Sequence, residues 1–177
     1  RKSYFHRLLD ELPEGSTVLK LGVGPGRGMF EWLERNPRKS IYFECVDVDK
    51  DAIEHARSLN LKYADKIVFH HASVFKFIPG SSARYDLIWA AGLFDYFDDR
   101  AFVALGSRFF GHLAEAGELV IGNFSPCNPT RPYMELFGNW KLNHRSADSL
   151  HSLAIRIGAD PEHIRVGQES EGVNLFL

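Results

Sequence analysis

The sequence predicts an α/β protein built on a doubly wound, mostly parallel sheet of seven strands with helices on both faces. Three observations support this fold class: strand-like and helix-like segments alternate along the chain, a glycine-rich turn follows the first strand, and an acidic residue ends the second. Strands that are separated by helices need crossover connections, and such connections build a parallel sheet.

The predicted strands are short apolar runs bounded by turn residues. They cover residues 17–21, 41–46, 67–71, 86–90, 118–123, 163–167 and 173–177. Apolar side chains at helical spacing predict helices at residues 2–12, after the glycine turn, after Asp49, from Asp98 to Leu113 and after Ser146. We expect Asp49, Asp98 and Ser146 to cap the last three of these helices.

Length and composition limit the classes of protein that the chain can represent. With 177 residues, of which 45% are hydrophobic, it can bury one good core, and we expect a single domain over residues 1–177. Because it begins at Arg1 rather than at methionine, we expect it to be a piece of a longer protein. A net charge of −2 gives no electrostatic footprint for nucleic acid.

Other features concern location and metals. No apolar run reaches the roughly 18 residues that a membrane span needs. The two cysteines do not make a disulfide framework, so we expect a reducing, cytoplasmic setting. The histidines have no partnered cluster of ligands around them, and we expect no metal site. The sequence leaves the oligomeric state open.

The stretch from Val18 to Gly28 predicts a cofactor site of the nucleotide type. Glycines let the backbone of a turn approach a ligand closely, and the amide groups at the start of the next helix attract polar or anionic groups. Asp47 follows about 20 to 25 residues later, where a carboxylate can bind ribose hydroxyls. The glycine spacing does not fit the G-x-G-x-x-G pattern of dinucleotide-binding folds, because Arg27 and Met29 occupy the third position in the two possible frames.

The pattern Leu-x-Leu-Gly-x-Gly-x-Gly, with Val-Asp-x-Asp at the second strand and Ala-Ile-Glu-His-Ala in the following helix, resembles the class I S-adenosylmethionine-dependent methyltransferases. The resemblance covers nearly the whole chain and implies a Rossmann-like fold of seven strands. It implies that the glycine turn wraps the methionine end of S-adenosylmethionine, that the acid of the second strand holds the ribose, and that Ser73 stands where an acid often holds the adenine edge. The residues it assigns to the cofactor are Gly22, Gly24, Gly26, Asp47, Val48, Ser73, Val74 and Ala91.

A narrower resemblance concerns the later half of the chain. The segments 85–96, 122–124, 128–129, 134–135 and 139–140 look like bacterial methyltransferases that make the quorum signal 3-hydroxypalmitic acid methyl ester. This resemblance implies a small-molecule acceptor and O-methylation of the carboxylate of a 3-hydroxy fatty acid. The residues expected to orient the acceptor are Asp95, Tyr96, Asn123, Arg131, Glu135, Trp140 and His144. Arg131 is the natural partner for an acceptor carboxylate.

Two departures from the family pattern keep alternatives open. Most class I members have an acid at the position of Lys20, and Ser73 replaces the usual acid at the adenine edge. A sensor or pseudoenzyme that binds the cofactor without turnover is therefore the second hypothesis. The third is a nicotinamide-dependent oxidoreductase, which the glycine spacing and the lack of a Tyr-x-x-x-Lys pair oppose.

Overall fold

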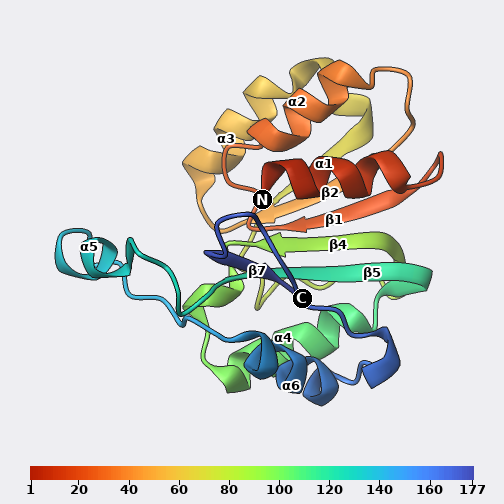
Figure 1. The fold of residues 1–177 in the computed structure, drawn as a ribbon. Helices are drawn as coiled ribbons and strands as arrows, with labels where there is room; N and C mark the ends of the chain where they lie inside the picture. The colour runs from red at the N-terminus through yellow and green to blue at the C-terminus, as the bar shows by residue number, and fades with distance from the viewer. The chain divides into compact units, whose positions relative to one another are not determined.

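The computed structural model describes all residues, 1–177, and confirms a seven-stranded α/β sheet (Figure 1). The strands are hydrogen-bonded in the order β3-β2-β1-β4-β5-β7-β6. The chain forms two compact units: residues 1–89 with 112–118, and residues 90–111 with 119–177. Strands β4 (Tyr85–Ala91) and β5 (Leu113–Phe124) each run from the first unit into the second. The expectation of a single domain stays a prediction.

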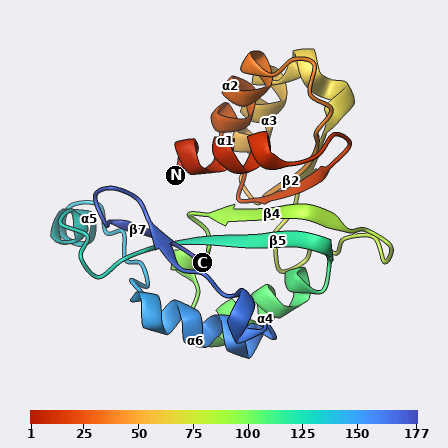
Figure 2. The same cartoon turned by 45° about the vertical axis from the view of Figure 1, so that its right-hand side comes forward.

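The first unit consists of parallel strands and the helices that connect them. Besides parts of β4 and β5, its elements are α1 (Lys2–Glu11), β1 (Thr17–Leu21), α2 (Arg27–Arg35), β2 (Tyr42–Asp47), α3 (Lys50–Leu59), the 3₁₀ helix η1 (Leu61–Lys66) and β3 (Ile67–His71). Strand β1 pairs in parallel with both β2 and β4, and β2 pairs in parallel with β3. Helices α1, α2 and α3 lie beside one another (Figure 2). The central strand β1 is deeply buried, since Val18, Leu19 and Leu21 are 0% exposed.

The second unit carries a helical pair and the antiparallel end of the sheet. Besides parts of β4 and β5, its elements are η2 (Phe94–Tyr96), α4 (Asp99–Phe110), α5 (Arg131–Leu136), α6 (Ala147–Ile157), η3 (Pro161–His163), β6 (Gly167–Gln168) and β7 (Asn174–Phe176). Strand β7 runs antiparallel to both β5 and β6. Helices α4 and α6 pack together, and α5 stands clear of this pair in both views (Figures 1 and 2).

The predicted helix starts are confirmed at atomic detail. The side chain of Asp49 accepts hydrogen bonds from the backbone amides of Asp51 and Ala52, and Asp98 accepts one from Ala101. In the same way, Ser146 caps α6. These contacts satisfy amide groups that have no partner within the helix, so a short polar residue before an apolar period was a reliable signal.

Two predicted segments are wrong. The helix expected to reach Leu113 ends at Phe110, with Gly111 as its C-cap, and β5 begins at Leu113. Gly117 lies inside β5, where a Cβ atom would stand 2.5 Å from the carbonyl oxygen of Tyr85. The strand expected at residues 163–167 is reduced to the two residues of β6, because Asp160 and Pro161 start a 3₁₀ turn instead.

None of the helices combines the length and the apolar character that crossing a membrane requires.

Candidate functional site

The glycine turn between β1 and α2 uses three residues with left-handed backbone. The φ angles of Gly22, Gly24 and Gly26 are +67°, +56° and +69°. A Cβ atom on Gly24 would meet nothing within 4 Å, whereas one on Gly26 would lie 3.0 Å from the Cβ of Ala56 in α3. Gly24 therefore borders open space, and Gly26 permits close packing of the turn against α3.

Asp47, at the carboxyl end of β2, is bonded directly to this turn. Its Oδ2 accepts a hydrogen bond from the backbone amide of Gly24 at 2.8 Å, and its Oδ1 accepts one from the amide of Asp49 at 3.0 Å. The carboxylate is half-buried. Because each carboxylate oxygen has a second lone pair, both oxygens can still accept a hydroxyl of a ribose. The structure thus brings together the turn and the acid that the sequence paired.

The other predicted cofactor residues lie at the ends of neighbouring strands. Val48 follows Asp47 and is 68% exposed, which leaves an apolar side chain free to pack on a planar group. The hydroxyl of Ser73, after β3, accepts a weak hydrogen bond from the amide of Phe75 at 3.3 Å. Val74 is buried, and Ala91 belongs to the second unit. The assignment of these residues to the cofactor stays a prediction.

Sequence reasoning missed Asn60, a buried residue that packs against the glycine turn at Gly26. This side chain is 1% exposed, and its Nδ2 donates to the carbonyl of Ala56 at 2.8 Å. The same Nδ2 lies 3.1 Å from where a Cβ of Gly26 would stand. Asn60 ends α3 far from the turn in sequence, so only the packing of α3 against the turn shows its role.

Lys20 is the unusual residue of the first unit. Its side chain is half-buried beside α1, with Nζ 5.9 Å from the centre of the Phe5 ring, and Nζ donates a hydrogen bond to the carbonyl of Val23 at 3.0 Å. Burial lowers the pKa of Lys20, although Cys45 and Asp47 act in the opposite direction. Burial also raises the pKa of the Cys45 thiol to about 12, so this neighbour is neutral.

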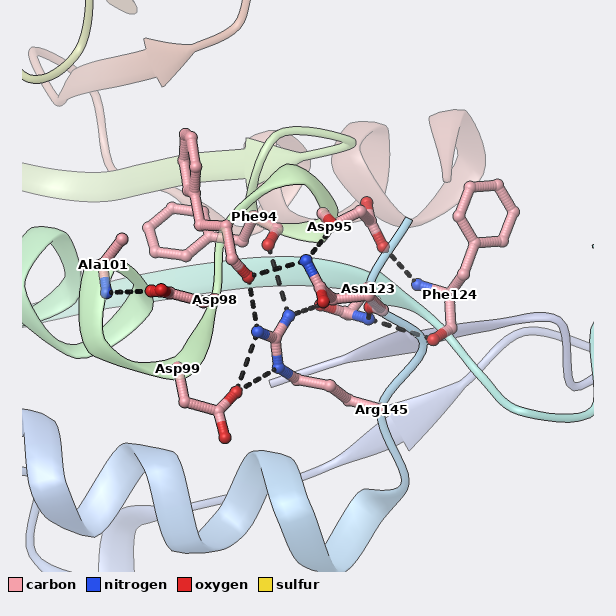
Figure 3. Close-up of polar contacts among 10 residues, drawn as sticks. Phe94, Asp95, Asp98, Asp99, Ala101, Asn123, Phe124 and Arg145 are labelled. Atoms are coloured by element: carbon pink, nitrogen blue, oxygen red, sulfur yellow. Dashed lines mark hydrogen bonds and ion pairs between the residues drawn. The ribbon is translucent and has the colours of Figure 1, made fainter. Parts of the chain in front are cut away.

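In the second unit, Asp95 and Asn123 belong to a buried polar network (Figure 3). Asp95 is 1% exposed, and its Oδ1 accepts a hydrogen bond from the amide of Phe124 at 2.6 Å. Asn123 is 0% exposed and donates to the carbonyls of Phe124 and Asn143. We therefore expect these two side chains to position the loops after β4 and β5 rather than to contact an acceptor.

The centre of this network is Arg145, a residue that sequence reasoning missed. Its guanidinium donates to Oδ1 of Asn123 at 2.9 Å, to Oδ1 of Asp99 at 2.9 Å and to the carbonyl of Phe97 at 2.6 Å (Figure 3). Arg145 is 4% exposed, although the Asp99 side chain is 57% exposed. No local pattern marks an arginine just before a helix cap as buried, because all its partners are more than 20 residues away.

The remaining predicted acceptor residues lie on and around α5. Arg131 pairs with Glu135 one helical turn later, with Nε and Oε1 2.7 Å apart, and this pairing lowers the pKa of Glu135. The indole of Trp140 donates to the hydroxyl of Tyr96 at 2.9 Å. His144 lies against the ring of Phe124, with ring centres 5.8 Å apart.

Apolar side chains are exposed on the same segment. They are Tyr133 (69%), Leu136 (77%), Phe137 (74%) and Trp140 (44%), together with Tyr96 (54%) after β4. We call this set the α5 apolar surface. Phe94, by contrast, is 0% exposed and packs on Phe97 and Phe102.

Solved structures share this fold across almost the whole chain. A protein described as a possible exported protein from Bordetella parapertussis is 20% identical, with a TM-score of 0.79 over 99% of this chain and 65% of that one. An O-methyltransferase family 2 protein from Planctomyces limnophilus, in complex with apigenin, is 15% identical, with a TM-score of 0.72 over 99% and 60%. The magnesium protoporphyrin IX methyltransferase of Synechocystis, with bound S-adenosylhomocysteine, is 12% identical, with a TM-score of 0.73 over 99% and 78%.

The chain thus spans about two thirds or less of the length of the first two of these proteins. Comparison with curated proteins gives no match. The profile of a methyltransferase domain matches residues 18–117, which include the glycine turn and Asp47 and make up more than half of the chain. The chain therefore belongs to the methyltransferase domain family, whose cofactor is S-adenosylmethionine.

Proposed function

We propose that this chain binds S-adenosylmethionine through the glycine turn and Asp47, and that it transfers the methyl group to a small molecule. The observation that carries the proposal is the hydrogen bond from the Gly24 amide to Asp47. This bond fixes the acid at the end of β2 beside a turn with open space above Gly24. The carboxylate keeps lone pairs for ribose hydroxyls, so the residues present fit the cofactor.

For methyl transfer, the protein mainly has to align the acceptor with the methyl group of the cofactor and exclude water. When bound, the cofactor supplies a methyl group on a sulfonium, which an acceptor nucleophile can attack in line. Asp47 and the glycine turn would hold the cofactor in one orientation, and Val48 would cover a face of its adenine. Positioning two reactants in this way removes much of the entropic part of the barrier. A carboxylate acceptor is already ionised at neutral pH and needs no general base.

For the acceptor, we propose an amphiphilic carboxylic acid, with 3-hydroxy fatty acids as the specific class. The support is the composition of the α5 segment, where the guanidinium of Arg131 lies on the same short helix as exposed Tyr133 and Leu136. Arg131 can bind a carboxylate bidentately, but Glu135 now accepts from it. An acceptor carboxylate would therefore have to exchange with that of Glu135.

The test is a turnover screen with a matched set of acceptors. 3-Hydroxy fatty acids of increasing chain length would be compared with their amides, and formation of S-adenosylhomocysteine would be measured. We expect turnover of the acids only, with KM falling as the chain lengthens, because burying each methylene contributes about 0.8 kcal/mol. Turnover of amides and acids alike would overturn the choice of a carboxylate acceptor.

A pair of variants tests the role of Arg131. We expect Arg131→Gln to raise the KM for the acid at least about tenfold, since a charge-assisted hydrogen bond is worth about 1.5–3 kcal/mol, and to leave cofactor affinity unchanged. Arg156→Gln, at an exposed position of α6, is the matched control and should keep the wild-type KM. Equal KM values for all three proteins would remove Arg131 from the acceptor site.

A second candidate function is a cofactor-binding sensor without turnover. The observation in its favour is Lys20, a half-buried cation beside the glycine turn. This candidate predicts that S-adenosylmethionine binds while no carboxylate in the screen is methylated. The two candidates are separated by measuring binding and turnover on the same preparation.

A further inference from the structure

Lys20 is a half-buried ammonium in the central strand β1, one residue before the strand ends. Its one hydrogen bond goes to a backbone carbonyl, that of Val23, and it forms no ion pair with a carboxylate. An ammonium has three donors, and burying a charge without a charged partner is costly. An apolar residue at this position would avoid this cost. We therefore look for a functional role of the positive charge.

Asp47, the carboxylate whose charge acts on Lys20, forms no ion pair with it. Both oxygens of Asp47 accept backbone hydrogen bonds, from Gly24 and Asp49. The other neighbours are the neutral Cys45 and the ring of Phe5. Lys20 thus has free donor capacity next to the turn that borders open space at Gly24.

The other cations near the start of α2 do not share this property. Arg27 is 77% exposed and pairs with Glu31 at 2.8 Å. Lys2 pairs with the second oxygen of the same Glu31, also at 2.8 Å. Lys20 is therefore the cation of this region that lacks an acidic partner.

The chemistry of the cofactor offers only one group that can serve as this partner. In S-adenosylmethionine the adenine and ribose are neutral, and the sulfonium and the amine are positive. The carboxylate of the methionine portion is the single anionic group. An ammonium beside the turn attracts this carboxylate and repels the amine, so it also fixes which way the methionine end lies.

We propose that Lys20 binds the carboxylate of the methionine portion of S-adenosylmethionine and is a specificity-determining residue for that group. The inference rests on the proposed function, because it needs the cofactor at the glycine turn. The hydrogen bond to Val23 holds Nζ beside the turn and leaves donors for the ligand. The lowered pKa of Lys20 agrees with a cation that lacks its anion in the free protein.

The experiment is a calorimetric titration with two ligands that differ only in this group, S-adenosylmethionine and decarboxylated S-adenosylmethionine. The proteins are the wild type, Lys20→Gln, Lys20→Arg and Lys62→Gln. Lys62 is an exposed lysine that pairs with Glu34 on the surface, so it controls for loss of a lysine charge. Circular dichroism verifies that each variant is folded.

We expect the wild type to bind S-adenosylmethionine about tenfold more tightly than the decarboxylated ligand, the effect of one charge-assisted hydrogen bond. Lys20→Gln should lose this discrimination through weaker binding of S-adenosylmethionine alone. Lys20→Arg should recover part of it, and Lys62→Gln should behave as the wild type.

Two results would overturn the proposal. One is that the wild type does not discriminate between the ligands, which needs no variant to observe. The other is that Lys20→Gln weakens both ligands equally, because the lysine then acts on the turn rather than on the carboxylate. If the wild type binds neither ligand, the proposed function itself fails, and this outcome is distinct from the first two.

Discussion

Two glycines of the turn after β1 have different structural roles, although both have left-handed backbone. Gly24 borders open space, while Gly26 packs on Ala56. For Gly24→Ala we predict a stability loss of about 1 kcal/mol from the backbone conformation, and at least tenfold weaker cofactor binding from a methyl group in the ligand's space. For Gly26→Ala we predict a larger stability loss, about 2 kcal/mol, from overpacking against α3.

Urea unfolding and calorimetry with S-adenosylhomocysteine together check this prediction. The two variants control for each other, since both place a Cβ on a residue with positive φ. Wild-type affinity in a folded Gly24→Ala protein would show that the cofactor does not occupy the space above Gly24.

We expect Lys20 to lower the stability of the folded protein and to strengthen cofactor binding. Since burial lowers its pKa, the folded protein binds this proton less tightly than the unfolded chain does, and charged Lys20 destabilises the fold at neutral pH. We predict that Lys20→Met raises the free energy of unfolding by about 0.5–2 kcal/mol at pH 7 while weakening cofactor binding.

The sign of the pH dependence follows from the same shift. Between the lowered pKa and the ordinary value of 10.5, the unfolded chain holds more protons than the folded one, so wild-type stability rises with pH. The advantage of Lys20→Met should therefore be largest near neutral pH and shrink in this alkaline window. Urea unfolding at several pH values measures this advantage, and an advantage that grows with pH would contradict a lowered pKa of Lys20.

At the residue scale, the sequence predicted what depends on local spacing. The glycines and Asp47 follow consecutive strands, so their meeting at one end of β1 and β2 could be inferred. Arg145 and Asn60 could not, because each is defined by burial against segments that are distant in sequence. Arg131 and Glu135 are four residues apart, a spacing at which side chains of a helix commonly form an ion pair, and they do so here. The sequence analysis assigned both residues to the acceptor site and did not predict this pair.

At the element scale, the packing of α4 on α6 depends on one small residue. A Cβ on Gly106 would lie 2.3 Å from Cδ1 of Ile157, and Ser107 donates to the carbonyl of Ile157 at 2.9 Å. We predict that Gly106→Ala destabilises the protein by about 1–3 kcal/mol. The double variant Gly106→Ala with Ile157→Val should be less destabilised than the sum of the two single changes, because removing Cδ1 relieves the closest contact and leaves only that to Cγ1, at 2.7 Å.

A double-mutant cycle in urea measures this coupling. Strict additivity of the two changes would mean that the helices shift apart instead of meeting at this contact. Cofactor affinity should stay unchanged throughout, since the assigned binding residues of the glycine turn and β2 belong to the first unit.

The elements themselves were predicted best where a cap or a buried run defines them. Strands β1 and β3 match their predicted ranges, and α6 ends at Ile157, with Gly158 (φ +112°) as its C-cap. The antiparallel end was predicted least well, because β6 and β7 have only two and three residues and the 3₁₀ turn at Pro161 replaces strand. Short edge strands carry too little periodicity to be recognised.

At the scale of the whole molecule, the alternation of strands and helices predicted a seven-stranded sheet, and the structure and its neighbours confirm it. Alternation could not show that β7 runs antiparallel to both β5 and β6, since this depends on how the chain returns after α6. Nor could it identify the acceptor, because the residues around α5 follow no periodic pattern.

The proposed cofactor site consists of the glycine turn and Asp47. The most direct test is calorimetric titration of the wild type, Asp47→Asn and the nearby exposed control Asp51→Asn with S-adenosylhomocysteine, with NAD as the competing nucleotide. We expect roughly micromolar binding of S-adenosylhomocysteine alone, at least tenfold weaker in Asp47→Asn through loss of charge-assisted hydrogen bonds, and unchanged in Asp51→Asn. Equal affinity of a folded Asp47→Asn protein, or binding of NAD in preference, would contradict this expectation.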